Sequence, residues 1–351
     1  MVPVVDLRRR ATRYSQEFLS AVGHVLESGQ VLLGPETEGL EAELAAWCGQ
    51  RHAVAVSSGA AALQLALAGA GVGAGDEVLV PAFTAVPTAS AVAATGATPI
   101  PVDVDAATAA LDEKEAAAAM GDRVRGVVTV HLYGRPAPVP DLGVPVIEDG
   151  AQAHGALEPG GDRGVATAYS FYPTKNLGGI GDGGAVTTDD AAVAERVRKG
   201  RVHGLAATES YEHAAVSQNH RMSEIEAAWL RLVLADLTTA NARRSAIAHR
   251  YREAAPHLRW HADHDHHVHH LCVVRVPRRE QFREQLAEAG VATAVHYQRA
   301  LTQQPAYHGL ARRPCPEAEA WAAECVTLPC FPELRDDEVD TVCQALAAAV
   351  P

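Results

Sequence analysis

The chain lacks the features that mark several classes of protein. Its six cysteines lie far apart and form no C-x-x-C pair, so neither a disulfide framework nor a cysteine-ligated zinc site has support, and we expect reduced, mostly buried thiols. No run reaches the roughly 18 uninterrupted apolar residues of a membrane span, and the opening "MVPVVDLRRR" has no apolar stretch long enough for a signal peptide. We therefore expect a cytoplasmic protein with no membrane partner.

Positive charge is also scarce. Thirty Lys and Arg residues against 43 Asp and Glu give a formal net charge of −13. Such a balance repels polyanions, which argues against nucleic acid as a partner. We expect small molecules as the ligands.

The order of predicted elements indicates an α/β protein. At 351 residues the chain exceeds the size at which one core keeps growing, so two units are expected. Short β-branched runs alternate with alanine-rich helical stretches from "HAVAVSSGAAALQLAL" onward, which predicts a largely parallel sheet covered on both faces. Beyond Asn241 we expect an Arg-rich helix and proline-broken segments. We therefore assign residues 1–239 to a large domain and residues 240–351 to a smaller one.

The helix over "SEIEAAWLRLVLADL" has a clear predicted start. Ser223 is followed three residues later by Glu226, a spacing that predicts a capping box. The expected apolar face consists of Ile225, Ala228, Trp229 and Leu232.

Two glycine-containing stretches could hold a phosphate. "GAGVGAGDEV" follows a helix and precedes a strand, the reverse of a dinucleotide fingerprint, so we interpret it as a helix stop and turn. In "VSSGAAALQ" a strand ends at Ser57 and Ser58 and a helix begins around Gly59 and Ala60, which directs free backbone N–H groups above the strand end. A plain helix N-cap explains the same pattern and is the alternative.

An acid and a lysine follow two later strands. Asp149 lies at the carboxyl end of the predicted strand in "PVIEDGAQAHGA", where open α/β sheets bind ligands, with a helix-capping Asp as the alternative. Lys175 follows the strand "ATAYSFYP" and precedes "NLGGIGDGGAV", which we expect to fold back as a hairpin. A partly desolvated lysine there has a lowered pKa and reacts with aldehydes, whereas a surface lysine is the alternative.

The three features together indicate one cofactor. A phosphate cradle near Gly59, a carboxylate at Asp149 and an amine at Lys175 are complementary to the phosphate, the pyridine nitrogen and the aldehyde of pyridoxal 5′-phosphate (PLP). Each signal is weak alone. The combination predicts a PLP enzyme.

The sequence resembles the DegT/StrS nucleotide-sugar aminotransferases, a group of fold-type-I PLP enzymes. The matching segments run in family order over nearly the whole chain and include "AVSSGAAALQLAL", "GDEVLVPAFTAVPTASAV", "VHLYGRPA", "VIEDGAQAHGA", "SFYPTKNLGGIGDGGAV", "NHRMSEIEAAWLRL" and "AVHYQRALTQQPAY". The resemblance implies a large domain with a mostly parallel seven-stranded sheet and a smaller C-terminal α/β domain.

The resemblance also implies roles for individual residues. By their place in the matching motifs, Lys175 binds the cofactor covalently, Asp149 binds its pyridine nitrogen, Gln152 contacts its ring hydroxyl and Ser170 binds its phosphate. Asn219 matches an asparagine that reaches the phosphate of the other subunit. That match implies a homodimer with shared active sites.

Two positions depart from the family pattern. Ala85 stands where an aromatic ring often stacks on the cofactor, so either Phe83 or another residue covers that face or the cover there is thinner. Ala60 stands where many relatives have a hydroxyl residue, which leaves the phosphate to backbone N–H groups and Ser170.

Histidines occur in two places of interest. His296 and Tyr297 lie in "AVHYQ", which faces the active site in similar proteins and predicts substrate contact, with a packed His-Tyr pair as the alternative. "HADHDHHVHH" has six histidines in ten residues. On a strand His267 and His269 would share a face, but no carboxylate or cysteine completes a ligand set at metal-like spacing, so we expect no metal.

By resemblance, the expected reaction moves an amino group from L-glutamate to a nucleotide-linked keto-deoxysugar, giving an amino sugar for natural-product or glycan biosynthesis. The N-terminal "VVDLRRR" and "SGQVLLGPE" favour the 3-amino branch. A dehydratase branch that replaces the lysine by histidine is disfavoured by Lys175. Two alternatives stay open: a cyclitol aminotransferase that uses scyllo-inosose and glutamine, and a PLP-bound regulator without turnover.

Overall fold

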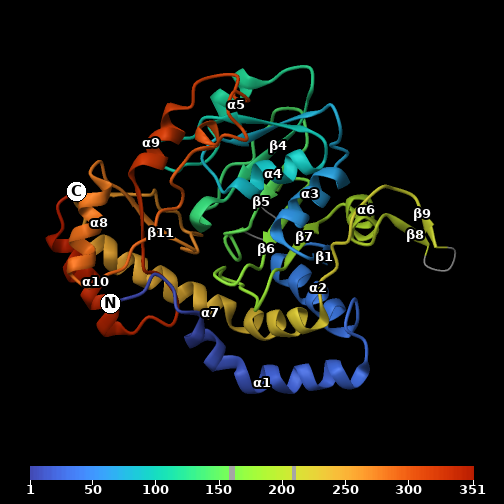
Figure 1. Ribbon diagram of the computed structural model, residues 1–351, viewed down its shortest axis with the longest axis horizontal. Coiled ribbons are helices and arrows are strands. Elements are labelled where there is room, and N and C mark those ends of the chain that lie inside the picture. Colours follow the sequence, from blue (N-terminus) through green and yellow to red (C-terminus); the bar gives the residue numbers. More distant parts are fainter. Residues whose placement is uncertain (158–162, 208–210) are drawn as a thin grey trace.

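A computed structural model describes residues 1–157, 163–207 and 211–351. Its centre is a seven-stranded sheet with strand order β1-β7-β6-β5-β4-β2-β3, which confirms the expected α/β architecture (Figure 1). The strands in this spatial order are β1 (His52–Val56), β7 (Gly184–Thr188), β6 (Ala166–Ser170), β5 (Val146–Asp149), β4 (Val124–Val130), β2 (Glu77–Pro81) and β3 (Thr98–Val102).

The sheet is parallel except at one strand. β2 pairs in parallel with β3 and β4, and β5 pairs in parallel with β4 and β6, whereas β7 is antiparallel to both β6 and β1. The glycine-rich stretch after Lys175 therefore does fold back as predicted, with Ser170 opposite Gly184. Because all strands but β7 run the same way, their carboxyl ends meet at one edge of the sheet.

Helices cover both faces of the large sheet, and successive side chains of each strand point to opposite faces. Val54 and Val56 of β1 pack with residues of α3 (Gly59–Gly69), α4 (Val86–Ala94) and α6 (Ala191–Arg201). Ala53 and Ala55 point to the other face and pack with α2 (Pro35–Cys48) and α7 (Glu224–Ala254). α5 (Glu113–Ala119) lies on this second face beside β2, β3 and β4, and α1 (Leu7–Ser28) lies outside α7 (Figure 1).

A smaller core forms the other end of the molecule. Its three-stranded antiparallel sheet has the order β10 (Arg259–Trp260), β11 (Cys272–Arg275) and β12 (Cys325–Leu328). The accompanying helices are α8 (Arg279–Glu288) and α10 (Asp336–Ala348), whereas α9 (Pro316–Glu324) packs in the large core through Ala318, Trp321 and Ala322. The 3-10 turns in the described residues are Leu132–Gly134 and Leu301–Gln303. Val2 packs in this core and pairs with Val291, so the N-terminus lies at the small end (Figure 1).

One long helix joins the two cores. The sequence pattern suggested a change to a separate Arg-rich helix after Asn241, but α7 continues without a break for 31 residues. Its first half packs on the large sheet, and Ile247, Ala248 and Tyr251 pack in the small core. The domain boundary at residue 240 stays a prediction, and it falls within this helix.

The predicted capping box at the start of α7 forms only in part. Ser223 Oγ accepts a hydrogen bond from the Glu226 N–H at 3.2 Å, as expected of the N-cap. The Glu226 carboxylate does not return to Ser223; it accepts a hydrogen bond from the Gly181 N–H at 3.1 Å. The glycine loop after Lys175 takes up the Glu226 carboxylate, so half of the box is missing.

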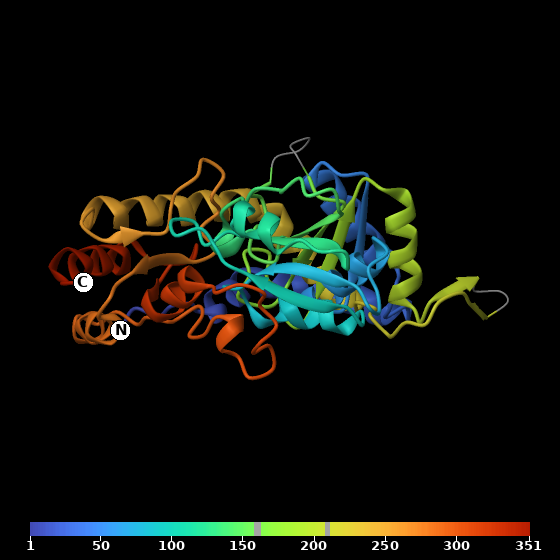
Figure 2. The same ribbon diagram turned by 90° about the horizontal axis from the view of Figure 1, so that it is seen from above.

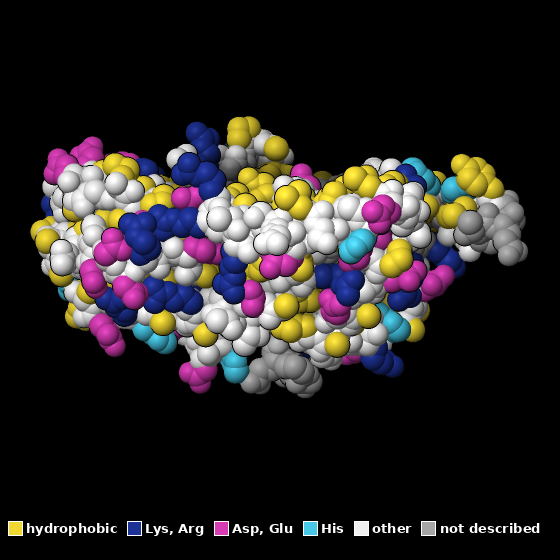
Figure 3. All heavy atoms as spheres, turned by 90° about the horizontal axis from the view of Figure 1, so that it is seen from below, with side chains coloured by type: hydrophobic (Ala, Val, Ile, Leu, Met, Phe, Trp, Pro, Cys, Tyr) yellow, Lys and Arg dark blue, Asp and Glu magenta, His cyan; other side chains and the backbone are white. Residues whose placement is uncertain are grey.

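Further features of the structure concern the cysteines, the helices, the projecting strands and the surface. All six cysteines are free, and five of them are buried. Within the described ranges, every helix is too short or too polar to span a bilayer. The short strands β8 (Leu205–Ala207) and β9 (Glu212–His213) project from the large domain (Figure 2). On the face shown in Figure 3, basic and acidic side chains are interspersed rather than gathered by sign.

Candidate active site

The carboxyl edge of the large sheet contains a cavity of about 280 Å³. Five residues predicted from the sequence lie together in its wall: Gly59, Ala60, Asp149, Ser170 and Lys175. The other lining residues are Ser58, Leu63, Ala85, Pro87, Thr88, Ala151, Tyr172 and Asp182. Residues separated by more than a hundred positions in the sequence thus meet because β1, β5 and β6 end at the same edge.

The N-terminus of α3 supplies backbone donors to the cavity. Ser58 caps the helix, and its Oγ accepts a hydrogen bond from the Ala61 N–H at 3.1 Å. Gly59 and Ala60 are the first two helical residues, so their N–H groups have no intrahelical acceptor and lie at the positive end of the helix dipole. A phosphate group fits this position.

Gly59 lies unusually close to Ser170. A Cβ atom added to Gly59 would lie 2.4 Å from the Ser170 Cβ and 2.9 Å from its Oγ. Only glycine allows the start of α3 to approach the end of β6 at this distance. The backbone donors and the Ser170 hydroxyl therefore lie side by side at one end of the cavity.

Asp149 ends β5 as a buried, hydrogen-bonded carboxylate. Its side chain is held by two donors: Thr88 Oγ1 donates to Oδ2 at 2.8 Å, and the Ala151 N–H donates to Oδ1 at 3.1 Å. The residues after Asp149 form a turn rather than a helix, so the helix-capping alternative does not apply. The carboxylate is instead fixed against the cavity.

Lys175 has the altered pKa that its surroundings predict. Burial of its amine lowers the pKa of Lys175 to about 8, while the negative charge of Asp149 acts in the opposite direction. Burial and the nearby Lys175 also lower the pKa of His154, to about 3, so this neighbour is a neutral ring. The surface-lysine alternative does not fit these surroundings.

A second cavity of about 410 Å³ adjoins the first, and Lys175 and Tyr172 line both. Gln152, His296 and Tyr297 lie in its wall. The Tyr133 N–H donates to Gln152 Oε1 at 2.6 Å, and Gln152 Nε2 donates to the Tyr297 hydroxyl at 2.9 Å. His296 Nδ1 lies 2.9 Å from Thr327 Oγ1. The side chains of His296 and Tyr297 are thus packed, and at the same time they line a cavity beside Lys175.

Asn219 lies outside both cavities. Its side chain is exposed, and the Arg221 Nε donates to its Oδ1 at 3.0 Å. The fold of one chain therefore does not bring Asn219 into the site formed by the other predicted residues.

The cavity wall near Ala85 has no aromatic cover from Phe83. Phe83 is fully buried and stacks on Trp321 with ring centroids 5.9 Å apart. The wall there consists of the small side chains Ala85 and Pro87. Our expectation that Phe83 could cover this face is wrong, because its ring belongs to the core between β2 and α9.

Sequence reasoning missed three residues of the site. Thr88, which binds Asp149, lies in a segment that we used only as a family motif, and Asp182, which lines the first cavity, lies in the predicted glycine-rich hairpin. Tyr133 has a left-handed backbone (φ 60°) that directs its N–H to Gln152. Thr88 was detectable in principle, since it lies one turn into the helix that follows the carboxyl end of β2.

The residues present fit PLP. Backbone donors and a hydroxyl meet at the Gly59–Ser170 approach, which an added Cβ would fill, and a carboxylate and an amine of lowered pKa line the same cavity. These groups match a phosphate, a protonated pyridine nitrogen and an aldehyde. When bound there, PLP would be held by Gly59, Ala60, Asp149, Ser170 and Lys175.

Comparison with known proteins gives a consistent result. Residues 12–347 match the model of the DegT/DnrJ/EryC1/StrS aminotransferase family. The chain is 42% identical to dTDP-3-amino-3,4,6-trideoxy-alpha-D-glucose transaminase from Streptomyces venezuelae, over 98% of this chain and 95% of the relative. It is 39% identical to the erythromycin biosynthesis sensory transduction protein EryC1 from Saccharopolyspora erythraea, over 99% of both.

Solved structures agree. The crystal structure of S. venezuelae DesV in complex with a ketimine intermediate superimposes with a TM-score of 0.93 at 40% identity, covering 99% of this chain and 97% of that one. The likeness therefore extends over both cores and the helix that joins them.

Proposed function

Since the chain belongs to the DegT/DnrJ/EryC1/StrS family of PLP-dependent aminotransferases, we propose that it transfers the amino group of L-glutamate to a nucleotide-linked keto-deoxysugar. The product is an amino sugar for natural-product or glycan biosynthesis, with the new nitrogen at C3. The observation that carries the proposal is the single cavity shared by the start of α3, Asp149 and Lys175. The relative whose name describes a 3-amino sugar supports the C3 position.

Two residues, Asp149 and Lys175, carry the chemistry in this proposal. PLP, when bound, would withdraw the electrons left on a substrate carbon that loses its proton. Asp149 would hold a proton on the pyridine nitrogen, because a fixed carboxylate favours the cationic ring. Lys175 would bind the cofactor covalently and, as a free amine, would take the proton from the substrate carbon, because its turn keeps the amine beside that carbon. The relatively low pKa of Lys175 suits an amine that must act as a base.

The other residues bind and orient. We assign the phosphate to the N–H groups of Gly59 and Ala60 and to the Ser170 hydroxyl. The Gln152 amide oxygen is occupied by the Tyr133 N–H and one amide hydrogen by Tyr297, so the second amide hydrogen is available for the ring hydroxyl. His296 and Tyr297 line the adjoining cavity, to which we assign the substrates.

We further propose that the enzyme is a homodimer with shared active sites. Asn219 is exposed and lies outside the cavity of its own chain. A second copy is required if Asn219 is to contact phosphate, in an isologous arrangement that gives two identical sites.

Covalent labelling tests the cofactor site. The sequence contains only three lysines, Lys114, Lys175 and Lys199, so reduction of the PLP-loaded protein with borohydride and peptide mapping gives an unambiguous answer. We expect the label on Lys175 alone. Lys175→Ala should lose it, and Lys199→Arg should keep it. A label on Lys114 or Lys199, or none, contradicts the assignment.

Product formation tests the reaction. Purified enzyme with L-glutamate and a panel of 3-keto and 4-keto nucleotide sugars should release 2-oxoglutarate only with a 3-keto acceptor. Turnover of scyllo-inosose with glutamine would indicate a cyclitol aminotransferase instead. A bound cofactor without any turnover would favour a protein without catalytic function, and the relative EryC1 is named a sensory transduction protein.

Complementation tests the shared site. Lys175→Ala and Asn219→Ala homodimers should both be impaired, and a mixture refolded together should regain activity, because a heterodimer contains one site with both wild-type residues. Absence of recovery in mixtures that do form heterodimers would contradict the shared arrangement while leaving the labelling result unaffected.

A further inference from the structure

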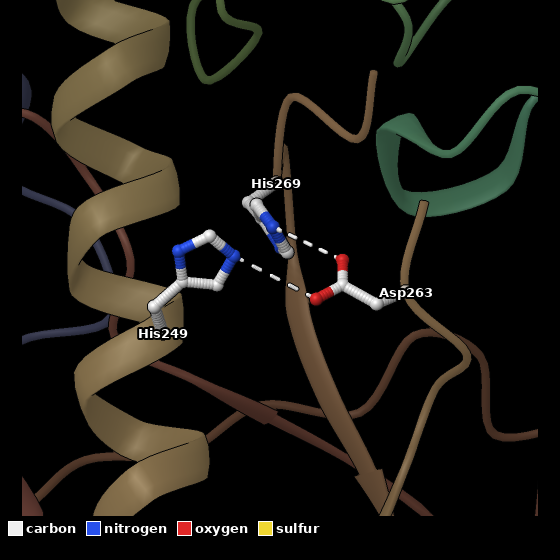
Figure 4. A group of neighbouring side chains, drawn as sticks. All are labelled: His249, Asp263 and His269. Carbon is white, nitrogen blue, oxygen red and sulfur yellow. Dashed lines mark ion pairs between the residues drawn. The ribbon is translucent and has the colours of Figure 1, made fainter. Parts of the chain in front are cut away.

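Only the last residue of the histidine-rich segment, His270, lines a cavity of the aminotransferase site. The segment lies in the loop between β10 and β11, and this loop packs against the second half of α7. There the structure brings together His249 of α7, Asp263 and His269 (Figure 4). His249 Nε2 lies 3.7 Å from Asp263 Oδ2, and His269 Nε2 lies 3.7 Å from Asp263 Oδ1. His249 lies outside the histidine-rich segment, in the preceding helix α7, and therefore joins Asp263 and His269 only in the folded chain.

We propose that His249, Asp263 and His269 form a binding site for a divalent transition-metal ion such as Zn²⁺, with water completing the coordination. Two imidazole nitrogens and one carboxylate oxygen are the donor set that Zn²⁺ accepts, whereas Mg²⁺ and Ca²⁺ prefer sites made of oxygen alone. The site is distinct from the PLP cavity, since none of the three residues lines it.

The separation of the ligand atoms suits such an ion. Zn²⁺ binds N and O ligands at about 2.0–2.2 Å, which places neighbouring ligand atoms of a tetrahedral site roughly 3.3–3.6 Å apart. The three side chains here offer ligand atoms that all lie within 4.8 Å of one another. Shifts of about an ångström in His249 and Asp263, whose side chains are 59% and 39% exposed, bring the set to the spacing of a tetrahedral Zn²⁺ site and leave room for water.

His269 is held as an oriented ligand. Its ring stacks on that of His267 with centroids 3.9 Å apart, and its backbone N–H donates to His267 Nδ1 at 3.0 Å. Only 3% of its side chain is exposed, so packing fixes the ring with Nε2 directed toward Asp263.

One cation competes for Asp263. Arg252 Nε lies 3.7 Å from Asp263 Oδ2. However, Arg252 has other partners: its Nη2 donates to the His261 carbonyl at 2.6 Å, and its guanidinium lies over the Trp260 ring at 5.4 Å. These contacts hold Arg252 when Asp263 turns toward the ion. Replacing Arg252 by Gln should therefore tighten metal binding rather than weaken it.

Metal binding should stabilise the fold, because the loop that contains Asp263 and His269 contacts other parts of the chain. The Val268 N–H donates to the Gly134 carbonyl at 3.0 Å, and His270 Nδ1 lies 3.1 Å from Asn176 Oδ1, next to Lys175 in the chain. An ion that joins His249 to Asp263 and His269 ties this loop to α7. Because the ion binds only the folded state, it should raise the melting temperature.

Calorimetric titration of the PLP-loaded, tag-free enzyme with ZnCl₂ tests the site. We expect one ion per chain, with His249→Ala and Asp263→Asn each weakening binding by roughly 100-fold, as expected for loss of one of three ligands. His264→Ala, which alters the same loop outside the cluster, should bind as the wild type does. Aminotransferase activity of the variants should stay unchanged without added metal.

A second readout separates this site from general affinity of histidines for zinc. Co²⁺ should give a visible spectrum that Zn²⁺ displaces, and this spectrum should be absent in Asp263→Asn. Both key variants change exposed side chains, so their melting temperatures without metal should match the wild type. Binding that persists in His249→Ala and Asp263→Asn, binding that is lost in His264→Ala, or no saturable binding in the wild type would overturn the proposal.

Discussion

Thr88 Oγ1 donates a hydrogen bond of 2.8 Å to Asp149 Oδ2, and both side chains are buried. Thr88 belongs to the first turn of α4, and Asp149 is the last residue of β5. Thr84 Oγ1 lies 3.0 Å from Thr88 Oγ1 and fixes the hydroxyl in turn. The contact therefore sets the orientation of the carboxylate that we assign to the pyridine nitrogen, which makes Thr88 a positioning residue.

Replacing Thr88 by Val should lower kcat about tenfold, equivalent to the ~1.5 kcal/mol that a hydrogen bond to a charged group contributes. KM for glutamate should change little, because Thr88 acts through Asp149 and touches no substrate in our assignment. Thr88→Ser keeps the hydroxyl and should retain most of the activity. Equal losses in Val and Ser variants would show that packing, not the hydrogen bond, matters at this position.

Reconstitution of the cofactor-free enzyme should depend on pH through Lys175. Only the neutral amine attacks an aldehyde, and the pKa of Lys175 is lowered to about 8, so the rate should rise roughly tenfold from pH 7 to pH 9 and then level off. Stopped-flow absorbance of PLP binding measures this profile. Asp149→Asn removes the charge that raises this pKa and should move the profile to lower pH. A rate that still climbs tenfold per unit above pH 9 would indicate an ordinary, solvated lysine.

Gly59→Ala should weaken PLP binding by at least about tenfold and destabilise the fold by roughly 1–3 kcal/mol, as expected for overpacking. The added Cβ would lie 2.4 Å from the Ser170 Cβ. Gly73→Ala is the matched control, since no atom lies within 4 Å of its added Cβ. Adding Ser170→Gly to Gly59→Ala removes the Ser170 Cβ and with it the clash, so stability should be restored. It also removes the Ser170 hydroxyl, so the affinity for PLP should stay low. Equilibrium dialysis and urea unfolding measure the two effects.

Glu226 makes stability depend on pH. Burial raises the pKa of Glu226 from 4.5 to about 7, with a further contribution from Asp182. The folded state therefore binds a proton that the unfolded state has released, so stability is highest below pH 4.5 for this group and falls as pH rises to about 7.

Glu226→Gln should remove this loss of stability at high pH. We expect the variant to be more stable by ~1–2 kcal/mol at pH 8 and to show no gain at pH 4; the figure allows for solvent screening of part of the pKa shift. Urea unfolding at both pH values checks the expectation. Glu17→Gln, on the exposed side of α1, should change stability at neither pH. A Glu226→Gln variant that is less stable at pH 8 would show that the carboxylate is favourable where it lies.

The sequence was sufficient for the order of elements and for the central residues of the site. β-branched runs alternate with helices, and a parallel sheet places the ends of its strands at one edge, so Ser58, Asp149 and Lys175 were expected to meet there. Hydrogen bonds between side chains of different elements could not be predicted from the sequence in the same way. The partners of Asp149 and Gln152 are Thr88 and Tyr133. The sequence places Thr88 in the helix after β2 but does not identify its partner, and no local pattern identifies Tyr133, because packing brings each pair together.

By itself, then, the sequence determined the α/β fold class and the chemistry of the cofactor site, since these depend on periodicity and on residue types at strand ends, and its motifs resembled those of the family. Tertiary structure decided which side chains hold those residues, that Glu226 binds the glycine loop instead of its own helix cap, and that His249 joins Asp263 and His269. The physical reason is that hydrogen bonds, burial and pKa values depend on neighbours in space, and α7 brings residues of both cores together only once the chain has folded.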